Sequence, residues 1–88
     1  MKAAYIAPDG GLIGWSLPRL RDGMAKVELA EAASGGLDIV LSTWVDDETA
    51  DKGGWWNHFG AAPIEEPWPW WVNELPGDVL AWLKEESK

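Results

Sequence analysis

The stretch that decides the fold is Leu37-Asp38-Ile39-Val40-Leu41-Ser42-Thr43-Trp44-Val45. Its residues form two alternating sets, one with Leu37, Ile39, Leu41 and Thr43, the other with Asp38, Val40, Ser42 and Trp44. An alternation with a period of two places successive side chains on opposite faces of a strand. The stretch is therefore predicted to be a β-strand, and it is the clearest strand signal in the chain.

The segment before this strand is ambiguous. Met24–Ala33 has apolar residues at every third position, as in a helix, but Val27 and Leu29 also alternate with charged residues, as in a strand. We favour the strand, and Ser34-Gly35-Gly36 is then a compact turn between two strands. Residues 24–45 are thus predicted to form an antiparallel hairpin.

A second hairpin is predicted at the N-terminus. Lys2–Ala7 is apolar enough to be a strand, and Pro8-Asp9-Gly10-Gly11 is a strong turn signal. Leu12–Leu17 then follows as the second strand, and Pro18 ends it.

Proline and helix signals organise the C-terminal part. Ala61–Trp71 contains three prolines and so cannot be a regular helix or a central strand. Within it, Pro67-Trp68-Pro69-Trp70-Trp71 is predicted to be extended, close to polyproline II. A final helix begins near Pro76, with an apolar stripe of Val79, Leu80, Trp82 and Leu83. The predicted class is α+β, a small β-rich domain of antiparallel hairpins with one C-terminal helix, and residues 1–88 form a single domain.

The tryptophan content is the outlier of the composition. The chain has 88 residues, eight of them Trp, and no cysteine. Disulfides and thiolate metal sites are thereby excluded. A small domain cannot easily bury eight indoles, and Trp is a favoured residue of protein interfaces. The composition therefore predicts that part of the tryptophan surface binds another protein.

The net charge of −8 restricts the partners. Phosphate backbones and anionic membranes are bound mainly by Lys and Arg, so we expect no direct nucleic-acid or membrane binding. No apolar run approaches the length of a membrane span, and the N-terminal apolar run stops at Pro8, too short for a signal peptide. Two interpretations of the acidity stay open: it keeps a Trp-rich chain soluble, or it imitates nucleic acid.

Nothing in the sequence favours catalysis or a cofactor. His58 is the only histidine, and no nucleophile motif surrounds any Ser or Thr. The acidic loop fits no calcium-binding register, since Lys52 or Ala50 falls where glycine or an oxygen ligand is needed. We predict no catalytic residues, no metal and no cofactor. Carbohydrate binding on Trp platforms remains a minor alternative.

The candidate binding residues fall into two sets. The aromatic set consists of Trp55, Trp56, Trp68, Trp70 and Trp71. The acidic set consists of Asp46, Asp47, Glu48 and Asp51. A pre-ordered polyproline segment carrying indoles loses little entropy on docking, although the same indoles could instead fold back and seal the core.

One region resembles the small baseplate protein family of Mu-like phages. The resemblance lies in Leu37–Ser42, then Asp46-Asp47-Glu48, then Gly53-Gly54-Trp55-Trp56. In that family an apolar run is followed by an acidic loop and an Arg-Gly-Trp-Trp-type motif. Here Gly53 replaces the basic residue, the loop is shorter and the C-terminal portion has no counterpart. The resemblance implies a structural role in the phage tail, without catalysis.

The expected function is therefore that of a non-enzymatic phage protein that binds other proteins, as a structural component of the tail or baseplate. An acidic inhibitor of a host defence complex, similar to an anti-CRISPR protein or a nucleic-acid mimic, is the alternative. The expected partners are virion neighbours or a host complex, and a homo-oligomer is left open. We expect the chain in the host cytoplasm when it is made, and then in the virion if it is a tail component.

Overall fold

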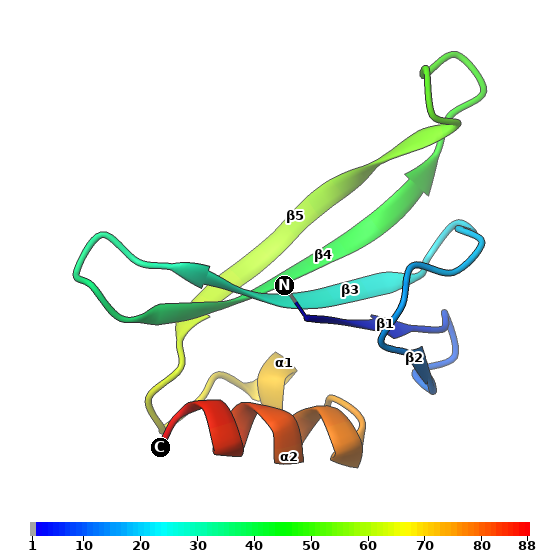
Figure 1. Cartoon of the computed structure of the whole chain (residues 1–88). Helices are drawn as coiled ribbons and strands as arrows, with labels where there is room; N and C mark the ends of the chain where they lie inside the picture. The colour runs from blue at the N-terminus through cyan, green and yellow to red at the C-terminus, as the bar shows by residue number, and fades with distance from the viewer. Residues whose placement is uncertain (1) are drawn as a thin grey trace.

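The structure, a computed structural model, describes residues 2–88. It has a five-stranded antiparallel sheet in the order β2-β1-β3-β4-β5 (Figure 1). The strands are Ala3–Ile6 (β1), Leu12–Gly14 (β2), Ala25–Glu31 (β3), Leu37–Asp46 (β4) and Gly54–Pro63 (β5). Two helices follow, Trp70–Asn73 (α1) and Gly77–Glu86 (α2). The predicted α+β class, with antiparallel hairpins and a C-terminal helix, is confirmed.

The alternation of side chains in Leu37–Val45, now part of β4, sets the two faces of the sheet. Ile39 and Leu41 of β4 pair with Leu29 and Val27 of β3, and all four side chains are buried. The strand interpretation of residues 24–33 is therefore correct, since β3 lies in the middle of the sheet between β1 and β4.

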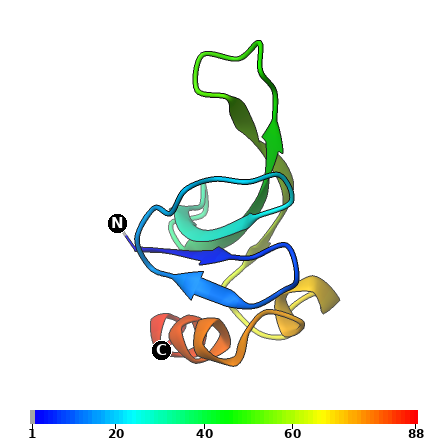
Figure 2. The same cartoon turned by 90° about the vertical axis from the view of Figure 1, so that its right-hand side faces the viewer.

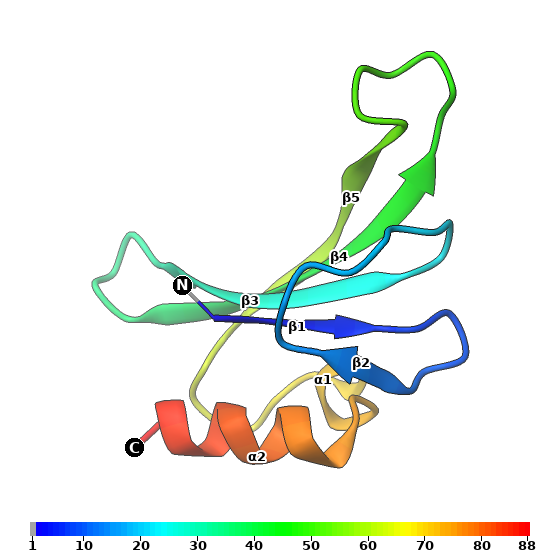
Figure 3. The same ribbon diagram turned by 45° about the vertical axis from the view of Figure 1, so that its right-hand side comes forward.

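Both helices cover one face of this sheet (Figures 2 and 3). The α2 stripe predicted from the sequence supplies Val79, Trp82 and Leu83 to the core, while Leu80 is half-buried. The buried core cluster spans both layers and consists of Ala4, Ile6, Val27, Leu29, Ile39, Leu41, Ile64, Trp68, Val72, Val79, Trp82 and Leu83.

The opposite face carries a second aromatic cluster. Trp56 lies 5.3 Å from Trp44 and 6.2 Å from Tyr5, measured between ring centroids. The Lys26 ammonium lies 4.6 Å from the Trp56 ring centroid, a cation–π contact. This face is therefore covered by its own aromatic and polar side chains, since both helices lie on the other side.

The hairpin of β4 and β5 projects beyond the helical layer (Figure 1). The Cα radius of gyration is 13.2 Å, whereas a compact chain of this length would have about 12 Å. The projecting hairpin makes the molecule longer in one dimension, 40 Å against 28 and 23 Å. In residues 2–88, no helix lies against either face of the outer half of this hairpin (Figure 1).

Three sequence expectations are corrected by the structure. The second strand ends at Gly14 and does not continue to Leu17. Gly54–Pro63 forms a ten-residue strand that the sequence reading missed. Residues 67–71 are extended only to Pro69, whose φ of −64° and ψ of 162° are those of polyproline II, and α1 begins at Trp70.

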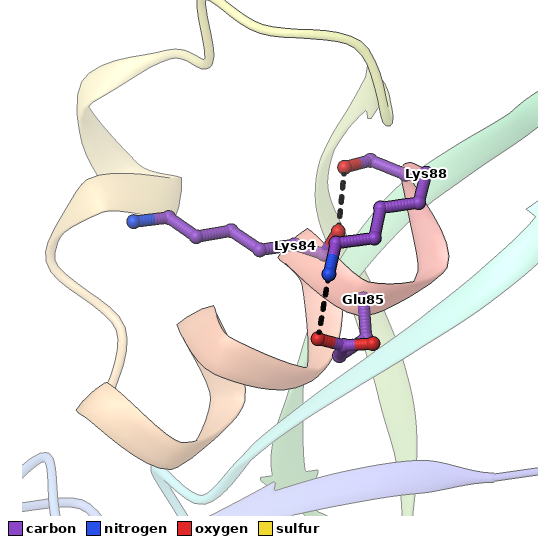
Figure 4. Close-up of polar contacts among 4 residues, drawn as sticks. Lys84, Glu85 and Lys88 are labelled. Atoms are coloured by element: carbon purple, nitrogen blue, oxygen red, sulfur yellow. Dashed lines mark hydrogen bonds and ion pairs between the residues drawn. The ribbon is translucent and has the colours of Figure 1, made fainter.

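The C-terminal end of α2 is held by local contacts (Figure 4). Lys88 Nζ lies 3.1 Å from Glu85 Oε1, and the Ser87 hydroxyl donates to the Lys84 carbonyl at 2.9 Å. Cations near the last turn also suit the negative end of the helix dipole. Among residues 2–88, no helix is both long and apolar enough to cross a membrane.

Candidate binding surface

Within residues 2–88, strand β5 is an outer edge of the sheet and pairs only with β4. Its ten residues contain no Asp, Glu, Lys or Arg, although the whole chain has 22 such residues, 15 acidic and 7 basic. Six of its ten residues are exposed, namely Trp55, Asn57, His58, Phe59, Ala61 and Pro63. The edge is thus an uncharged, accessible backbone with aromatic side chains on it.

A β-bulge shapes the middle of this edge. Leu41 pairs with Gly60 and Ser42 pairs with His58, so Phe59 is an extra residue in β5. A bulge bends its strand and re-aims the side chain that it carries. The Phe59 ring packs against Trp71 of α1 in a T-shaped contact, with centroids 6.1 Å apart. Phe59 of the bulge is thereby in contact with Trp71 of α1.

The five predicted tryptophans separate into four environments. Trp55 and Trp70 are exposed, at 45% and 66%, and Trp71 is half-buried between Phe59 and Gly60. Trp56 lies in the aromatic cluster on the opposite face. Trp68 is only 7% exposed, and its indole N–H donates to the Ile64 carbonyl at 2.8 Å. The structure therefore places Trp68 in the core, where it is unavailable as a surface anchor.

Phe59 is a surface aromatic that the sequence reading did not select. It is 51% exposed and comes from the missed strand. We call the set Trp55, Phe59, Trp70 and Trp71 the β5–α1 aromatic residues. The sequence shows that Phe59 lies close to Trp55 and Trp56 along the chain. Its exposure could not be predicted, because it depends on the bulge in β5.

The predicted acidic residues lie at the tip of the projecting hairpin, and the side chains of two of them accept hydrogen bonds. Asp46 accepts a hydrogen bond from the Trp44 indole at 2.8 Å. The Asp47 carboxylate accepts from the hydroxyl and the backbone N–H of Thr49, at 2.6 and 2.9 Å. These bonds, the hydroxyl first, lower the pKa of Asp47 below its ordinary value, so the carboxylate stays charged to lower pH.

Glu48 and Asp51 have a different role from their two neighbours. Both are exposed, and within residues 2–88 neither takes part in a hydrogen bond or an ion pair of its side chain. They are the acidic residues of the loop that are free to meet a partner.

The opposite end of β5 is also acidic. Pro63 and Ile64 are followed by Glu65 and Glu66, both exposed. The sequence reading did not select this pair. Glu65 and Glu66 matter because β5 separates them from the acidic loop, so that acidic residues stand at both ends of one strand. The sequence alone did not predict this strand.

His58 lies on β5, with Ser42 of β4 as its cross-strand neighbour. No hydrogen bond joins the two side chains within the described residues, and Ser42 is buried while His58 is exposed. A nucleophile and its base would be within hydrogen-bond reach. In residues 2–88, no three His, Cys, Asp or Glu side chains lie together as a metal site would require.

Two open hollows lie away from the β5–α1 aromatic residues. One, of about 230 Å³, is lined by Lys2, Leu29, Glu31, Leu37, Trp82 and Glu86. The other, of about 250 Å³, lies around Ala32, Leu37, Pro63 and Glu65. Sites for small molecules are commonly about 300–1,000 Å³, so both hollows are small for that purpose.

Comparison with protein-family models, with curated proteins and with solved structures found no match to this chain.

Proposed function

We propose that this chain is a non-enzymatic protein-binding domain, and that the β5–α1 aromatic residues form its contact surface. The observation that carries the proposal is the exposure of Trp55, Phe59 and Trp70 on an edge strand and the helix beside it. Exposed aromatic side chains are the usual anchors of protein interfaces, because they bury large apolar area with few rotatable bonds.

The proposed biological role is that of a structural component of a phage tail or baseplate. It rests on the resemblance of Leu37–Ser42, Asp46–Glu48 and Gly53–Trp56 to the Mu-like baseplate family. The β5–α1 aromatic residues are apolar and uncharged, which suits a permanent contact with a neighbour in an assembly, since permanent interfaces are more apolar than transient ones. In this role the partner is another virion protein.

The proposal is tested by replacing Trp55, Phe59 and Trp70 together by serine in tagged protein and recovering bound chains from induced or infected cells. We expect recovery of the partner to fall at least tenfold, because hot-spot aromatics contribute about 2 kcal/mol or more each. The bound chains are identified by mass spectrometry, and the virion role expects tail proteins among them.

The matched control is Ile13→Ser with Leu17→Ser. These residues are 44% and 66% exposed, at and just beyond β2 on the other edge of the sheet. Serine there removes exposed apolar surface without touching β5 or α1. Equal losses in both variants, or no loss in the triple variant, would show that the β5–α1 aromatic residues are not the contact surface.

A second function, inhibition of a host defence complex, is favoured by one observation. The acidic loop stands at the tip of the projecting hairpin, with Glu48 and Asp51 free of side-chain partners in the described chain. An inhibitor that imitates nucleic acid should bind through this loop, so its affinity should fall steeply with salt. Glu48→Gln with Asp51→Asn should then abolish recovery of a host complex, whereas the tail role, which is anchored on aromatic side chains, expects only a partial loss of its partner.

A further inference from the structure

We propose that the free edge of β5 binds an extended segment of the partner as a sixth strand, and that this segment has an uncharged centre with basic residues at both ends. The inference rests on the proposed function and names the chemistry of the partner. It joins three observations: a long edge without charged residues, acidic residues at both of its ends, and indoles beside it.

The two edges of the sheet differ in how they are protected. Proteins block edge pairing with short strands, charged side chains, prolines and bulges. The β2 edge is only three residues long. The β5 edge is ten residues long and has no charged residue, and Pro63 stands only at its last position. The bulge at Phe59 interrupts this edge at one place and leaves Gly54–Asn57 before it. Backbone groups there are available for pairing with another chain.

Acidic residues flank this uncharged strand on both sides. Glu48 and Asp51 precede it in the loop, and Glu65 and Glu66 follow it. The loop also contains Lys52, but its four acids leave it net negative. A partner segment that pairs with Gly54–Asn57 and extends past the bulge along β5 would therefore meet negative charge at each end and none in the middle. Lys or Arg at both ends of the added segment complements this pattern.

The same charges disfavour a second copy of the chain on this edge. Two β5 strands paired antiparallel about a two-fold axis would bring the acidic loop of each copy to Glu65 and Glu66 of the other. Like charges opposite each other destabilise a pair of strands. The charge pattern that attracts a basic-ended segment thus repels this chain itself.

The side chains of β5 suit the same partner. Across a strand pair, opposite side chains lie about 5 Å apart, so an added strand would place side chains beside Trp55 and Trp56. This protein already binds its own cations on indoles: Lys26 over Trp56 at 4.6 Å and Lys2 over Trp15 at 4.1 Å. A Lys or Arg of the partner can make the same contact with the exposed Trp55 ring.

The test begins with a display selection of random peptides of about 12 residues, long enough to cover a strand and its flanks, on immobilised protein. We expect enriched peptides with Lys or Arg near both ends of an apolar or β-branched centre. Enrichment of proline-rich peptides, of peptides without basic ends, or of none at all would overturn the inference.

Synthetic peptides then distinguish strand addition from other modes of binding. Only alternate backbone N–H groups of an edge strand point to its neighbour. N-methylation of one alternate set in an enriched peptide should weaken binding at least tenfold, and N-methylation of the other set should leave it nearly unchanged. Equal effects of both sets would rule out strand addition.

The charge requirement is tested on the protein. Glu48→Gln, Asp51→Asn, Glu65→Gln and Glu66→Gln together should weaken the peptide about tenfold, as several exposed ion pairs would. The control is Glu85→Gln with Glu86→Gln, on α2, which should change little. If the peptide selection and the N-methylated peptides give the contrary results described above while the Trp55/Phe59/Trp70 variant still loses its partner, strand addition is wrong and the protein-binding function stands. If that variant also keeps its partner, both proposals are wrong.

Discussion

Replacing Trp68 by alanine is expected to lower the free energy of unfolding by about 3–5 kcal/mol, as for other buried Trp residues. The indole is 7% exposed and lies in the core cluster with Val72, Val79 and Leu83. Alanine would leave a cavity between the sheet and the helices, and the Ile64 carbonyl would lose its 2.8 Å hydrogen bond. A small domain has only about 5–15 kcal/mol in total, so the variant should unfold at much lower denaturant concentration. Urea unfolding followed by circular dichroism measures the difference.

Trp70→Ala is the matched comparison, because it removes the same side chain two residues away. Trp70 is 66% exposed, so its removal should change the free energy of unfolding by no more than about 0.5 kcal/mol, as for most surface substitutions. It should instead weaken partner binding. Equal destabilisation by the two substitutions would mean that Trp68 is not the core residue of this segment.

Gly54→Ala is expected to lower the free energy of unfolding by about 3 kcal/mol, the upper end of the usual cost of overpacking. A Cβ at Gly54 would collide with the Val45 carbonyl oxygen and lie 2.7 Å from Trp44 Cζ2. The carbonyl belongs to the backbone of β4, and the Trp44 ring is held by its bond to Asp46, so neither can easily move. The start of β5 should detach from β4, which thermal unfolding and the exchange of β5 amide hydrogens would both detect.

The control for this substitution is Gly77→Ala, at the first position of α2. A Cβ there meets no atom within 4 Å, and alanine favours a helix over glycine. The variant should be as stable as the parent, or more stable by up to about 1 kcal/mol. Loss of stability at Gly77 as large as at Gly54 would show that the close approach of Gly54 to β4 is not the cause.

The central hairpin and the C-terminal helix could be predicted because their signals are local. Leu37–Val45 alternates with a period of two, and Val79, Trp82 and Leu83 recur with a helical period. The strand at 54–63 was missed because its bulge at Phe59 breaks the alternation and Pro63 suggested irregular structure. A bulge is defined by its pairing with β4, which no local pattern contains.

The candidate site was predicted in part for the same reason. Trp55 and Trp70 were selected from composition and are exposed, whereas Trp68, from the same proline-rich segment, is buried. Sequence reasoning had left open whether these indoles fold back onto the core. The structure resolves the choice residue by residue: Trp68 is buried in the core, Trp70 at the start of α1 is exposed, and Trp71 is half-buried against the core cluster.

The sequence by itself determined the α+β class, the central hairpin, the C-terminal helix and the excess of indole over what a small core can hold. These features follow from periodicity, turn residues and counts, which act over a few neighbouring residues. Only the tertiary structure decided that β5 is a free edge, that acidic residues stand at both of its ends, and which tryptophans reach the surface. Each of these depends on contacts between residues far apart in the chain, since an edge exists only relative to the strands beside it and burial only relative to the layer packed above.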